Sequence, residues 1–237
     1  MIESSALNNE CSECSIRLRS VLCHLCKEEV QSLNDSKRSV TFKKGQMIFY
    51  EDSFPKHLYC ITGGKVKLTQ TGVDGKEQIV QLACAGDVIG YRAVLCHEKY
   101  SGSAIALEQT TACLIPIELF FSYIRDNHKI VNQVIRLFSR ELKEAERKLI
   151  DITQRTVKER VAHTLLLLKE SHGFEIDGCT LRIDMKREEL ASIAGTTRET
   201  ATRILKEMKQ KGILDLIGKK IKIIRHKELM RTARIFD

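Results

Sequence analysis

The sequence predicts an α+β fold in which a β-roll comes first, a long helix follows, and a mainly helical unit ends the chain. Three observations lead to this prediction. Short alternating apolar runs, separated by glycines, fill residues 40–116; a heptad of apolar residues follows them; and the last third carries helix-capping signals before a strand hairpin. The predicted parts are a cysteine-rich segment at 1–30, a β-roll at 31–125, a helix at 126–153 and a helix-turn-helix unit with a β-wing at 154–237.

Composition places the chain among globular proteins. It has 237 residues, of which 43% are hydrophobic and 30% charged. The longest aliphatic cluster is the four leucines at 165–168, far below the ~18 apolar residues that span a bilayer. The first ten residues carry acidic side chains and no apolar core of a secretory signal. We therefore expect a cytoplasmic protein that does not enter a membrane.

Charge is concentrated toward the C-terminus. The net charge is +8, and residues 156–237 hold 18 lysines and arginines against 12 acidic residues. A basic C-terminal third indicates a polyanionic partner, although an ordinary solvated surface has the same composition.

Nine cysteines, an odd number spread along the chain, argue against a disulfide framework and favour a reducing compartment. Four of them form two Cys-x-x-Cys pairs in the run CSECSIRLRSVLCHLC, at Cys11, Cys14, Cys23 and Cys26. Spacing alone leaves zinc, an iron–sulfur cluster and metal-free thiols open, because eight residues between the pairs is tighter than the common Cys₄ zinc pattern. Four others have no partner spacing and are predicted to be buried small hydrophobic residues: Cys60, Cys84, Cys96 and Cys179.

The β-rich region consists of the runs TFKKGQMIFY, HLYCITGGKVKLTQ, EQIVQLACAGDVIGY and SGSAIALEQTTACLIP. Regular glycine turn signals between short strands favour a barrel or roll over an α/β sheet. The stretch GVDGKEQ is typical of a hairpin turn.

The long helix carries an apolar seam with alternating steps of four and three residues. Its members are Val131, Ile135, Phe138, Leu142, Ala145, Leu149 and Ile152. So narrow a stripe, flanked by charges, needs a partner helix, and we expect a homodimer through a parallel coiled coil. The alternative is that the helix packs on its own β-domain.

The last third begins with a capping box, Thr156 to Glu159, for a helix that runs to about residues 172–173. The stretch KREELASIAG predicts a short helix before a turn at Gly195. A second capping box, Thr196 to Glu199, opens the helix TRETATRILKEMKQKG, and GILDLIGKKIKII predicts two short strands. Together these elements indicate a winged helix-turn-helix.

The second helix of that motif carries side chains suited to reading DNA. Arginine bonds guanine in a bidentate way and glutamate accepts from cytosine, while lysines meet phosphates. The candidates are Arg198, Glu199, Thr202, Arg203 and Lys206, with Lys209, Lys211, Lys219 and Lys220 for phosphates. As an alternative, Glu199 only closes the capping box or pairs with Arg203, and the unit is a dimeric protein-interaction module. The chain has no Gly-rich phosphate loop and no nucleophile–base constellation, so we expect no enzyme.

The stretch REELASIAGTTRETATRILKEMKQKGIL resembles the DNA-binding signature of the CRP/FNR family of bacterial transcription regulators. The likeness extends to FKKGQMIFYEDS, LYCITGGKVKL and GDVIG in the roll, and covers residues 11 to 235. It implies a β-roll of the cyclic-nucleotide-binding type, a dimerisation helix, and a homodimeric activator that contacts RNA polymerase, although the residues do not give the sign of regulation. It also implies a two-fold symmetric double-stranded DNA site whose G·C-containing half-sites meet Arg198, Glu199 and Arg203.

Two positions depart from the cyclic-nucleotide binders of this family. Tyr91 stands where they have a ribose-binding glutamate, and Gly102, ahead of Ser103, stands where they have a phosphate-binding arginine. Because a cyclic phosphate loses its bidentate contact, we expect no binding of cyclic AMP.

The cysteines resemble those of FNR-type oxygen sensors, which hold a [4Fe–4S] cluster with three N-terminal thiols and one from the roll. The resemblance implies Cys11, Cys14 and Cys113 as ligands, with Cys23 or Cys26 completing the set, because the third spacing departs from the FNR motif. Oxygen or nitric oxide would then switch DNA binding. A zinc site on Cys11, Cys14, Cys23 and Cys26, or no metal at all, stays open.

Overall fold

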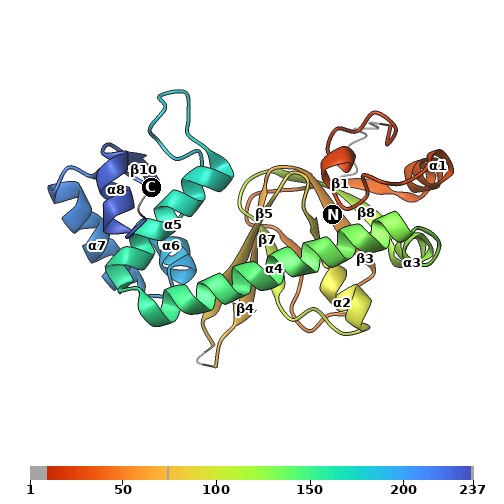
Figure 1. Cartoon of the computed structure of the whole chain (residues 1–237), viewed down its shortest axis with the longest axis horizontal. Coiled ribbons are helices and arrows are strands. Elements are labelled where there is room, and N and C mark those ends of the chain that lie inside the picture. The colour runs from red at the N-terminus through yellow and green to blue at the C-terminus, as the bar shows by residue number, and fades with distance from the viewer. Residues whose placement is uncertain (1–9, 74, 236–237) are drawn as a thin grey trace. The chain divides into compact units, whose positions relative to one another are not determined.

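The computed structural model describes residues 10–73 and 75–235, in two compact units divided between residues 142 and 143 (Figure 1). The ends of the predicted N- and C-terminal parts, residues 1–9 and 236–237, lie outside the described residues, as does Asp74 of the GVDGKEQ turn. Within the described ranges, no helix is long and apolar enough to cross a bilayer. The α+β architecture expected from the sequence is confirmed.

Over its described residues the first unit holds eight strands, a short 3-10 helix at Arg17–Arg19, three α-helices and the first half of a fourth. They are α1 Lys27–Ser36, β1 Arg38–Phe42, β2 Met47–Phe49, β3 His57–Gly63, β4 Lys65–Thr71, β5 Glu77–Cys84, β6 Val88–Ile89, α2 Tyr91–Cys96, β7 Ser103–Ala106, β8 Thr110–Pro116, α3 Ile117–Asp126 and α4 His128–Gln154. The strands form two four-stranded antiparallel sheets, in the orders β1-β8-β3-β6 and β2-β7-β4-β5.

The interior of the roll is apolar because alternate residues of the strands point inward. Ile61, Val66, Ala83, Ala104 and Ala112 are buried there. The tight β3–β4 connection depends on Gly64, which has a φ of +83° and lies against the backbone of Gln109. A side chain at that position would clash, so glycine is required.

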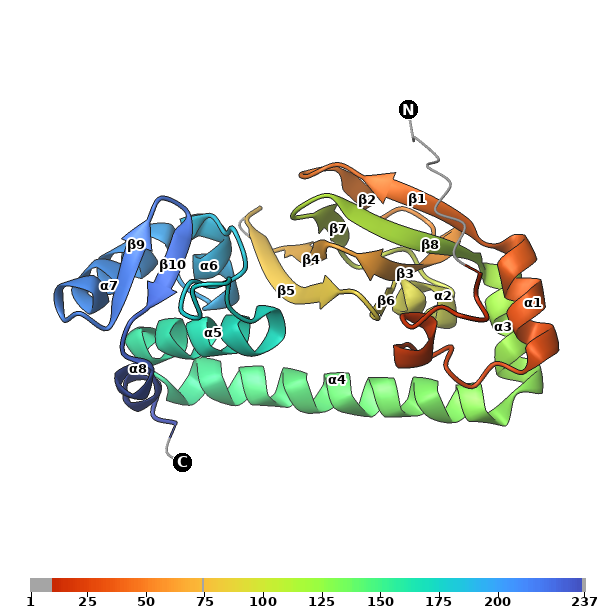
Figure 2. The same cartoon turned by 90° about the horizontal axis from the view of Figure 1, so that it is seen from above.

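A second core lies where the N-terminal residues and helices meet the roll. Leu22, Leu33, Leu58, Phe120 and Ile130 are buried in it, so the residues before α1 are part of the folded unit. Figure 2 shows α1 beside α3 at this end of the roll, with the chain before α1 folded against it. We call residues 10–26 the cysteine segment.

Helix α4 presents different faces to its surroundings. Ile130 and Val134 are buried against the roll, and Phe138 packs edge-on against Tyr91 with ring centroids 5.5 Å apart. Leu142 and Leu149 are 63% and 65% exposed. The predicted seam therefore divides: Phe138 contributes to its own unit, and four members stay exposed on the chain: Ile135, Leu142, Leu149 and Ile152. Val131 is half-buried and Ala145 exposed.

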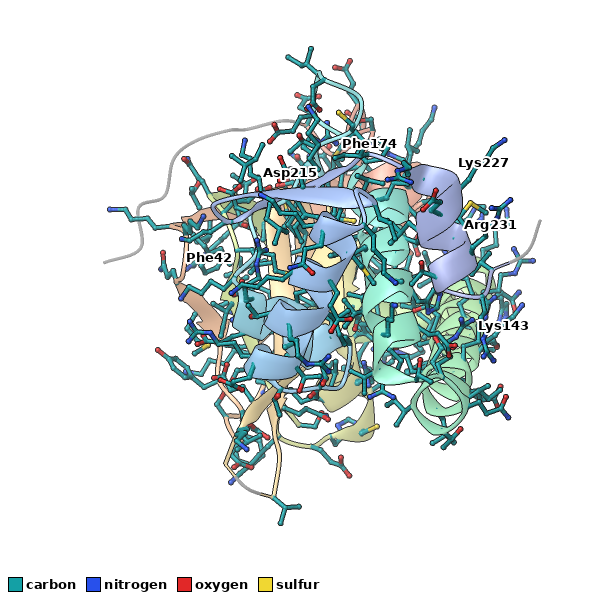
Figure 3. All side chains as sticks on the ribbon, turned by 90° about the vertical axis from the view of Figure 1, so that its left-hand side faces the viewer. Phe42, Lys143, Phe174, Asp215, Lys227 and Arg231 are labelled. Atoms are coloured by element: carbon teal, nitrogen blue, oxygen red, sulfur yellow. The ribbon has the colours of Figure 1, made fainter. Side chains whose placement is uncertain are left out.

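The second unit begins within α4 and holds the remaining elements. They are α5 Val157–His172, α6 Arg187–Ile193, α7 Arg198–Gln210, β9 Leu214–Ile217, β10 Lys220–Ile223 and α8 His226–Thr232. The capping box of Thr156 and Glu159 is present at the start of α5. Figure 3 looks onto this unit, with Asp215 on the β9–β10 hairpin and Lys227 and Arg231 on α8. The two strands predicted around Gly218 are confirmed.

The predicted second capping box is wrong by one residue. Thr197, not Thr196, caps α7, and its hydroxyl accepts from the backbone N–H of Thr200 at 3.3 Å. Thr196 instead donates its backbone N–H to the carbonyl of Ala191, closing the turn after α6. Glu199 is consequently not the box partner of the cap, and its side chain belongs to the exposed face of α7.

The prediction of four buried cysteines holds for one of them. Cys60 is buried, whereas Cys84 and Cys179 are half-buried and Cys96 is exposed at the end of α2. Isolated spacing in the sequence does not determine burial, because burial depends on which elements cover a strand or helix end.

Candidate functional site

The exposed face of α7 is the first candidate site. Ala201, Ile204, Leu205 and Met208 are buried on the other face, and this anchors the helix in the second unit. The opposite face forms a shallow groove whose lining contains all five candidates predicted on this helix: Arg198, Glu199, Thr202, Arg203 and Lys206, joined by Glu207 and Gln210. The helix thus presents one continuous polar surface.

The two arginines of this face are paired with carboxylates at the surface. Arg198 Nη1 lies 3.0 Å from Glu188 Oε1, and Arg203 Nη1 lies 2.6 Å from Glu207 Oε1. Both guanidinium groups are largely exposed, so each pair is worth only about 0–1 kcal/mol. A nucleic-acid acceptor can therefore replace the carboxylate at little cost.

The predicted phosphate-contacting lysines differ in their surroundings. Lys206, Lys211 and Lys219 are exposed, and over residues 10–73 and 75–235 none of them forms an ion pair. Lys209 pairs with Asp215 and Lys220 with Glu175, each at 2.6 Å. Lys219 lies at the tip of the hairpin, the position of a wing that reaches a DNA backbone.

Two further arginines position the motif, and sequence reasoning missed both. Arg160 of α5 donates to the carbonyls of Ala194 and Gly195, which form the turn before α7. Arg187 donates to the carbonyls of Gly218 and Lys219 in the wing. Neither has a local sequence signal, because their acceptors lie about thirty residues away.

The second candidate site is the cysteine segment with the strands beneath it. Cys113 of β8 lies directly across from Cys60 of β3, and its Sγ is 3.9 Å from Ser39 Oγ on β1. Burial, reinforced by the neighbouring Cys113 and Cys14 thiols, raises the pKa of Cys60 to about 12. Burial also raises the pKa of Cys113, and Cys11 and Cys14 add to the effect. Cys11, Cys14 and Cys113 therefore share one region with Cys60, which the sequence did not nominate.

The remaining predicted ligands lie differently. Cys26 is exposed at the start of α1, where its thiol lies beside Glu28 and Glu29. Cys23 is half-buried in the turn before it. In the described part of the chain no three cysteine, histidine or acidic side chains are arranged as a ready metal site. Thiolates are the ligands of iron–sulfur clusters, so the cysteines are donors of the right chemical type, but the described ones are not arranged as a ligand set in this structure.

The cysteine segment is tied to the start of α4 through Glu29 and through the carbonyl of His24, which accepts from Asn127 Nδ2 at 3.2 Å. Glu29 Oε2 accepts from the backbone N–H of Cys26 at 2.7 Å and from Asn127 Nδ2 at 2.8 Å. Asn127 Oδ1 in turn accepts from the backbone N–H groups of Lys129 and Ile130. Asn127 thus caps α4 while it holds the cysteine segment.

The cavity of the roll is small. It has a volume of about 120 Å³, below the roughly 300 Å³ at which ligand pockets begin, and Tyr91 and Gly102 line it. Phe49 and Tyr100 stack in its wall with centroids 3.9 Å apart. A Cβ atom on Gly102 would lie 2.3 Å from the carbonyl oxygen of Thr69, so the backbone leaves no room for an arginine side chain there.

Comparison with known proteins gives the family. The cyclic nucleotide-binding domain family matches residues 39–127, and the Crp-like helix-turn-helix domain family matches residues 159–232. The chain is 30% identical to the fumarate and nitrate reduction regulatory protein of Vibrio cholerae, over 99% of this chain and 94% of that protein. The chain belongs to the CRP/FNR family. It is a transcription regulator with a DNA-binding helix-turn-helix, and this family does not consist of enzymes.

Other CRP/FNR proteins are similar over most of their length. The CRP-like cAMP-activated global transcriptional regulator of Mycobacterium tuberculosis is 29% identical over 86% of this chain and 92% of that protein. The solved structure of FixK2 from Bradyrhizobium japonicum has a TM-score of 0.73 at 23% identity, and covers 83% of this chain and 96% of that one. This last likeness supports the CRP/FNR fold.

Proposed function

We propose that this CRP/FNR regulator is a homodimer that reads a two-fold symmetric DNA site through α7 and is switched by an iron–sulfur cluster labile to oxygen or nitric oxide. The observation that carries the DNA-reading part is the single polar face of α7, with two arginines and a glutamate among its side chains. Bidentate arginine contacts to guanine and glutamate contacts to cytosine favour a G·C-containing half-site.

The homodimer is supported by the apolar stripe of α4. Ile135, Leu142, Leu149 and Ile152 are exposed on a single chain and recur at heptad positions. Large apolar side chains in such a row indicate a partner surface. A second copy of the same helix provides an equivalent stripe and produces the two-fold symmetry that the DNA site requires.

The switch is supported by the gathering of Cys11, Cys14 and Cys113 and by the link from Glu29 to Asn127. A [4Fe–4S] cluster supplies a reaction with oxygen or nitric oxide that ends in its loss. Thiolates from the cysteine segment and from β8 would hold that segment against the roll. Asn127, which caps α4, would then couple the position of the segment to the start of α4. A shift of α4 toward one dimer geometry would change the affinity of the regulator for DNA.

The first test is made on the full chain purified without oxygen. Iron, zinc and acid-labile sulfide per chain are measured, with the visible spectrum before and after air. Iron and sulfide, with an absorbance band that bleaches in air, support the switch. Zinc alone, on the Cys11, Cys14, Cys23 and Cys26 set, or metal-free protein, contradicts the cluster and leaves a regulator that answers another signal.

The DNA-reading part is tested separately by binding to duplex DNA at increasing salt. We expect the logarithm of the binding constant to fall linearly with the logarithm of salt concentration, because phosphate contacts release counterions. Failure to bind duplex DNA would instead favour a protein-interaction module. The same proposal includes a cytoplasmic location, contact with RNA polymerase and activation of transcription. In vitro transcription with purified polymerase tests the last two.

A further inference from the structure

The last turns of α4, residues 143–154, belong to the second unit, which also holds α7. Leu149 and Ile152 in these turns are 65% and 58% exposed and are members of the stripe proposed as the dimer surface. The second unit therefore contains both a part of that surface and the helix proposed to read DNA. The contacts inside this unit fix the position of one relative to the other.

The first of these contacts joins the end of α4 to α5 through one carboxylate. Asp151 Oδ1 lies 2.6 Å from Arg155 Nε, and Asp151 Oδ2 lies 2.8 Å from His163 Nδ1 on α5. The side chains of Asp151 and Arg155 are 22% and 23% exposed. Those of Glu188 and Arg198, the pair on the exposed face of α7, are 60% and 62% exposed. Solvent and salt screen the Asp151 contact less, so it holds the end of α4 more firmly.

The turn after α8 holds Arg155 from a second side. Arg155 Nη1 donates to the carbonyl of Ala233, a residue that is fully buried. The next residue, Arg234, has a φ of +49° and places its Nε 2.7 Å from Glu159 Oε1 on α5. The turn after α8 thus contacts both α5 and the residue that joins α4 to α5. Because Arg155 bonds to α4 and to this turn at once, its guanidinium has one defined position.

Arg160 continues the connection to the turn before α7. Its Nη1 donates to the carbonyl of Arg155 at 3.0 Å, its Nε to that of Ala194 at 2.9 Å and its Nη2 to that of Gly195 at 3.0 Å. A Cβ atom on Gly195 would lie 3.9 Å from Ile152 Cγ1, so α4 also reaches this turn directly. Hydrogen bonds therefore connect the last turn of α4 with the turn that leads into α7.

We propose that Arg155 and Arg160 are positioning residues that fix the spacing between the two half-sites of the DNA site, although neither lies on the face of α7 that is proposed to read DNA. In a two-fold dimer, the distance and angle between the two copies of α7 depend on how firmly each is held to its own α4. A firm connection selects one spacing, and a loose connection accepts several. This inference rests on the proposed function, because it concerns the same homodimer and the same two-fold site.

The test starts from the full-length wild type and a pool of duplexes with a randomised stretch long enough for two half-sites one helical turn apart. Selection by binding gives the preferred site and its spacing. The selected site is then made again with one base pair added or removed between the half-sites. Each such change turns one half-site relative to the other by roughly 35°, because a turn of duplex holds about 10 base pairs.

Fluorescence anisotropy measures the affinity of each protein for the three duplexes. The proteins are the wild type, Arg155→Met, Arg160→Met and Arg231→Met, which is the matched control because Arg231 is an exposed arginine of α8. Circular dichroism and sedimentation verify that each variant is folded and dimeric. Asp151→Asn, which removes only the charge of that side chain, replaces a variant that does not fold.

We expect the wild type to bind the altered spacings at least about fivefold more weakly, the loss that follows when one good base contact fails. In Arg155→Met and Arg160→Met this ratio should fall toward one, and in Arg231→Met it should equal that of the wild type. An unchanged ratio in a folded variant would overturn the role of that arginine, even if its affinity fell for all three duplexes alike, since a general loss of stability has that effect.

Two results with the wild type complete the test. Equal affinity for all three spacings would overturn the inference and leave the proposed DNA-reading dimer standing. A wild type that is monomeric, or that selects no two-fold site, overturns the proposed function itself, which is a separate result.

Discussion

Arg203 and Lys206 lie one turn apart on the exposed face of α7, and under the proposed function they would make two different kinds of DNA contact. A guanidinium is a planar fork that recognises a base edge, and an ammonium is a point charge that meets a phosphate equally well in any sequence. The surface pair of Arg203 with Glu207 is short but exposed, so it holds the arginine without preventing its use.

At this scale we predict that Arg203→Met and Lys206→Gln weaken DNA binding in different ways. The arginine variant should lose about 1–3 kcal/mol on the preferred site and little on other sequences, which relaxes specificity. The lysine variant should weaken binding to all sequences alike and lower the salt slope by about 1. Fluorescence anisotropy on matched and mismatched duplexes measures both. Glu207→Gln is the control, and a loss of affinity in it would contradict the account of Arg203.

Gly102 shows how one backbone contact restricts the chemistry of the roll. Its Cα faces the carbonyl of Thr69, and a Cβ atom there would overlap that oxygen. The position that carries a phosphate-binding arginine in cyclic-nucleotide binders of the family is thus occupied by a residue whose neighbours exclude any side chain.

We predict that cyclic AMP does not raise the melting temperature of the wild type, and that Gly102→Arg neither creates binding nor preserves stability. The substitution should cost at least about 1–3 kcal/mol through overpacking. Its neighbour Ser101 is exposed, so Ser101→Arg should stay within about 0.5 kcal/mol of the wild type. Thermal unfolding with and without the nucleotide measures this. Saturable stabilisation of either protein by cyclic AMP would contradict it.

At the scale of elements, α4 has two apolar faces with separate uses. Ile130 and Val134 bury their side chains against the roll, where the helix is fixed by packing. Further along, Leu142 and Leu149 leave more than 60% of their surface exposed. Complete burial of a leucine is worth about 1.5–3 kcal/mol, so a row of them across a two-fold axis can hold a dimer.

We predict that Leu142→Lys with Leu149→Lys converts a dimer into a monomer, because four buried charges replace four leucines in the pair. Glu144→Lys, on the outer side of the same helix, should remain dimeric although it alters charge by more than either leucine substitution does. Sedimentation equilibrium across a range of concentrations measures the change. A monomeric wild type, or an unaltered dimer in the double variant, would contradict the assignment of this face.

At the scale of the whole molecule, the proposed switch requires that a signal at the cysteines reach α4 through its contacts with the N-terminal residues. Glu29 is one of two links between them: its Oε2 accepts from both Cys26 and Asn127, and the carbonyl of His24 accepts from Asn127 as well. Helix α4 begins in the first unit and continues into the second, which holds the DNA-binding motif. A change at the cap of α4 is therefore a change in the element that connects sensor and reader.

We predict that Glu29→Ala weakens the coupling between DNA affinity and the state of the proposed cluster, because alanine removes the acceptor shared by Cys26 and Asn127. In the wild type, the affinities of anaerobic and air-exposed protein should differ by about 5–150-fold, the usual range of coupling between two sites. In Glu29→Ala this ratio should fall while iron content stays normal. Glu28→Ala, a change at an exposed neighbour, is the matched control. A full ratio in Glu29→Ala would show that the signal takes another route.

The sequence by itself determined the order of the parts and the position of the helix that we propose reads DNA. Glycine turns, the heptad of α4 and the capping box at Thr156 are signals read within about ten residues, and short-range patterns of this kind specify elements directly. The reading face of α7 followed from the same periodicity, since positions three and four apart share a side of a helix. Even here the cap at Thr197 depended on where the preceding turn closed.

Only the tertiary structure decided which distant residues meet. Cys60 faces Cys113 because β3 and β8 are neighbours in the sheet, and Glu29 bonds Asn127 across a sequence separation of 98 residues. Phe138 likewise packs within its own unit rather than on a partner helix, because Tyr91 of α2 lies beside it. No local sequence period predicts such pairs. They form only when loops close and apolar faces pack against each other, and both depend on the fold of the whole chain.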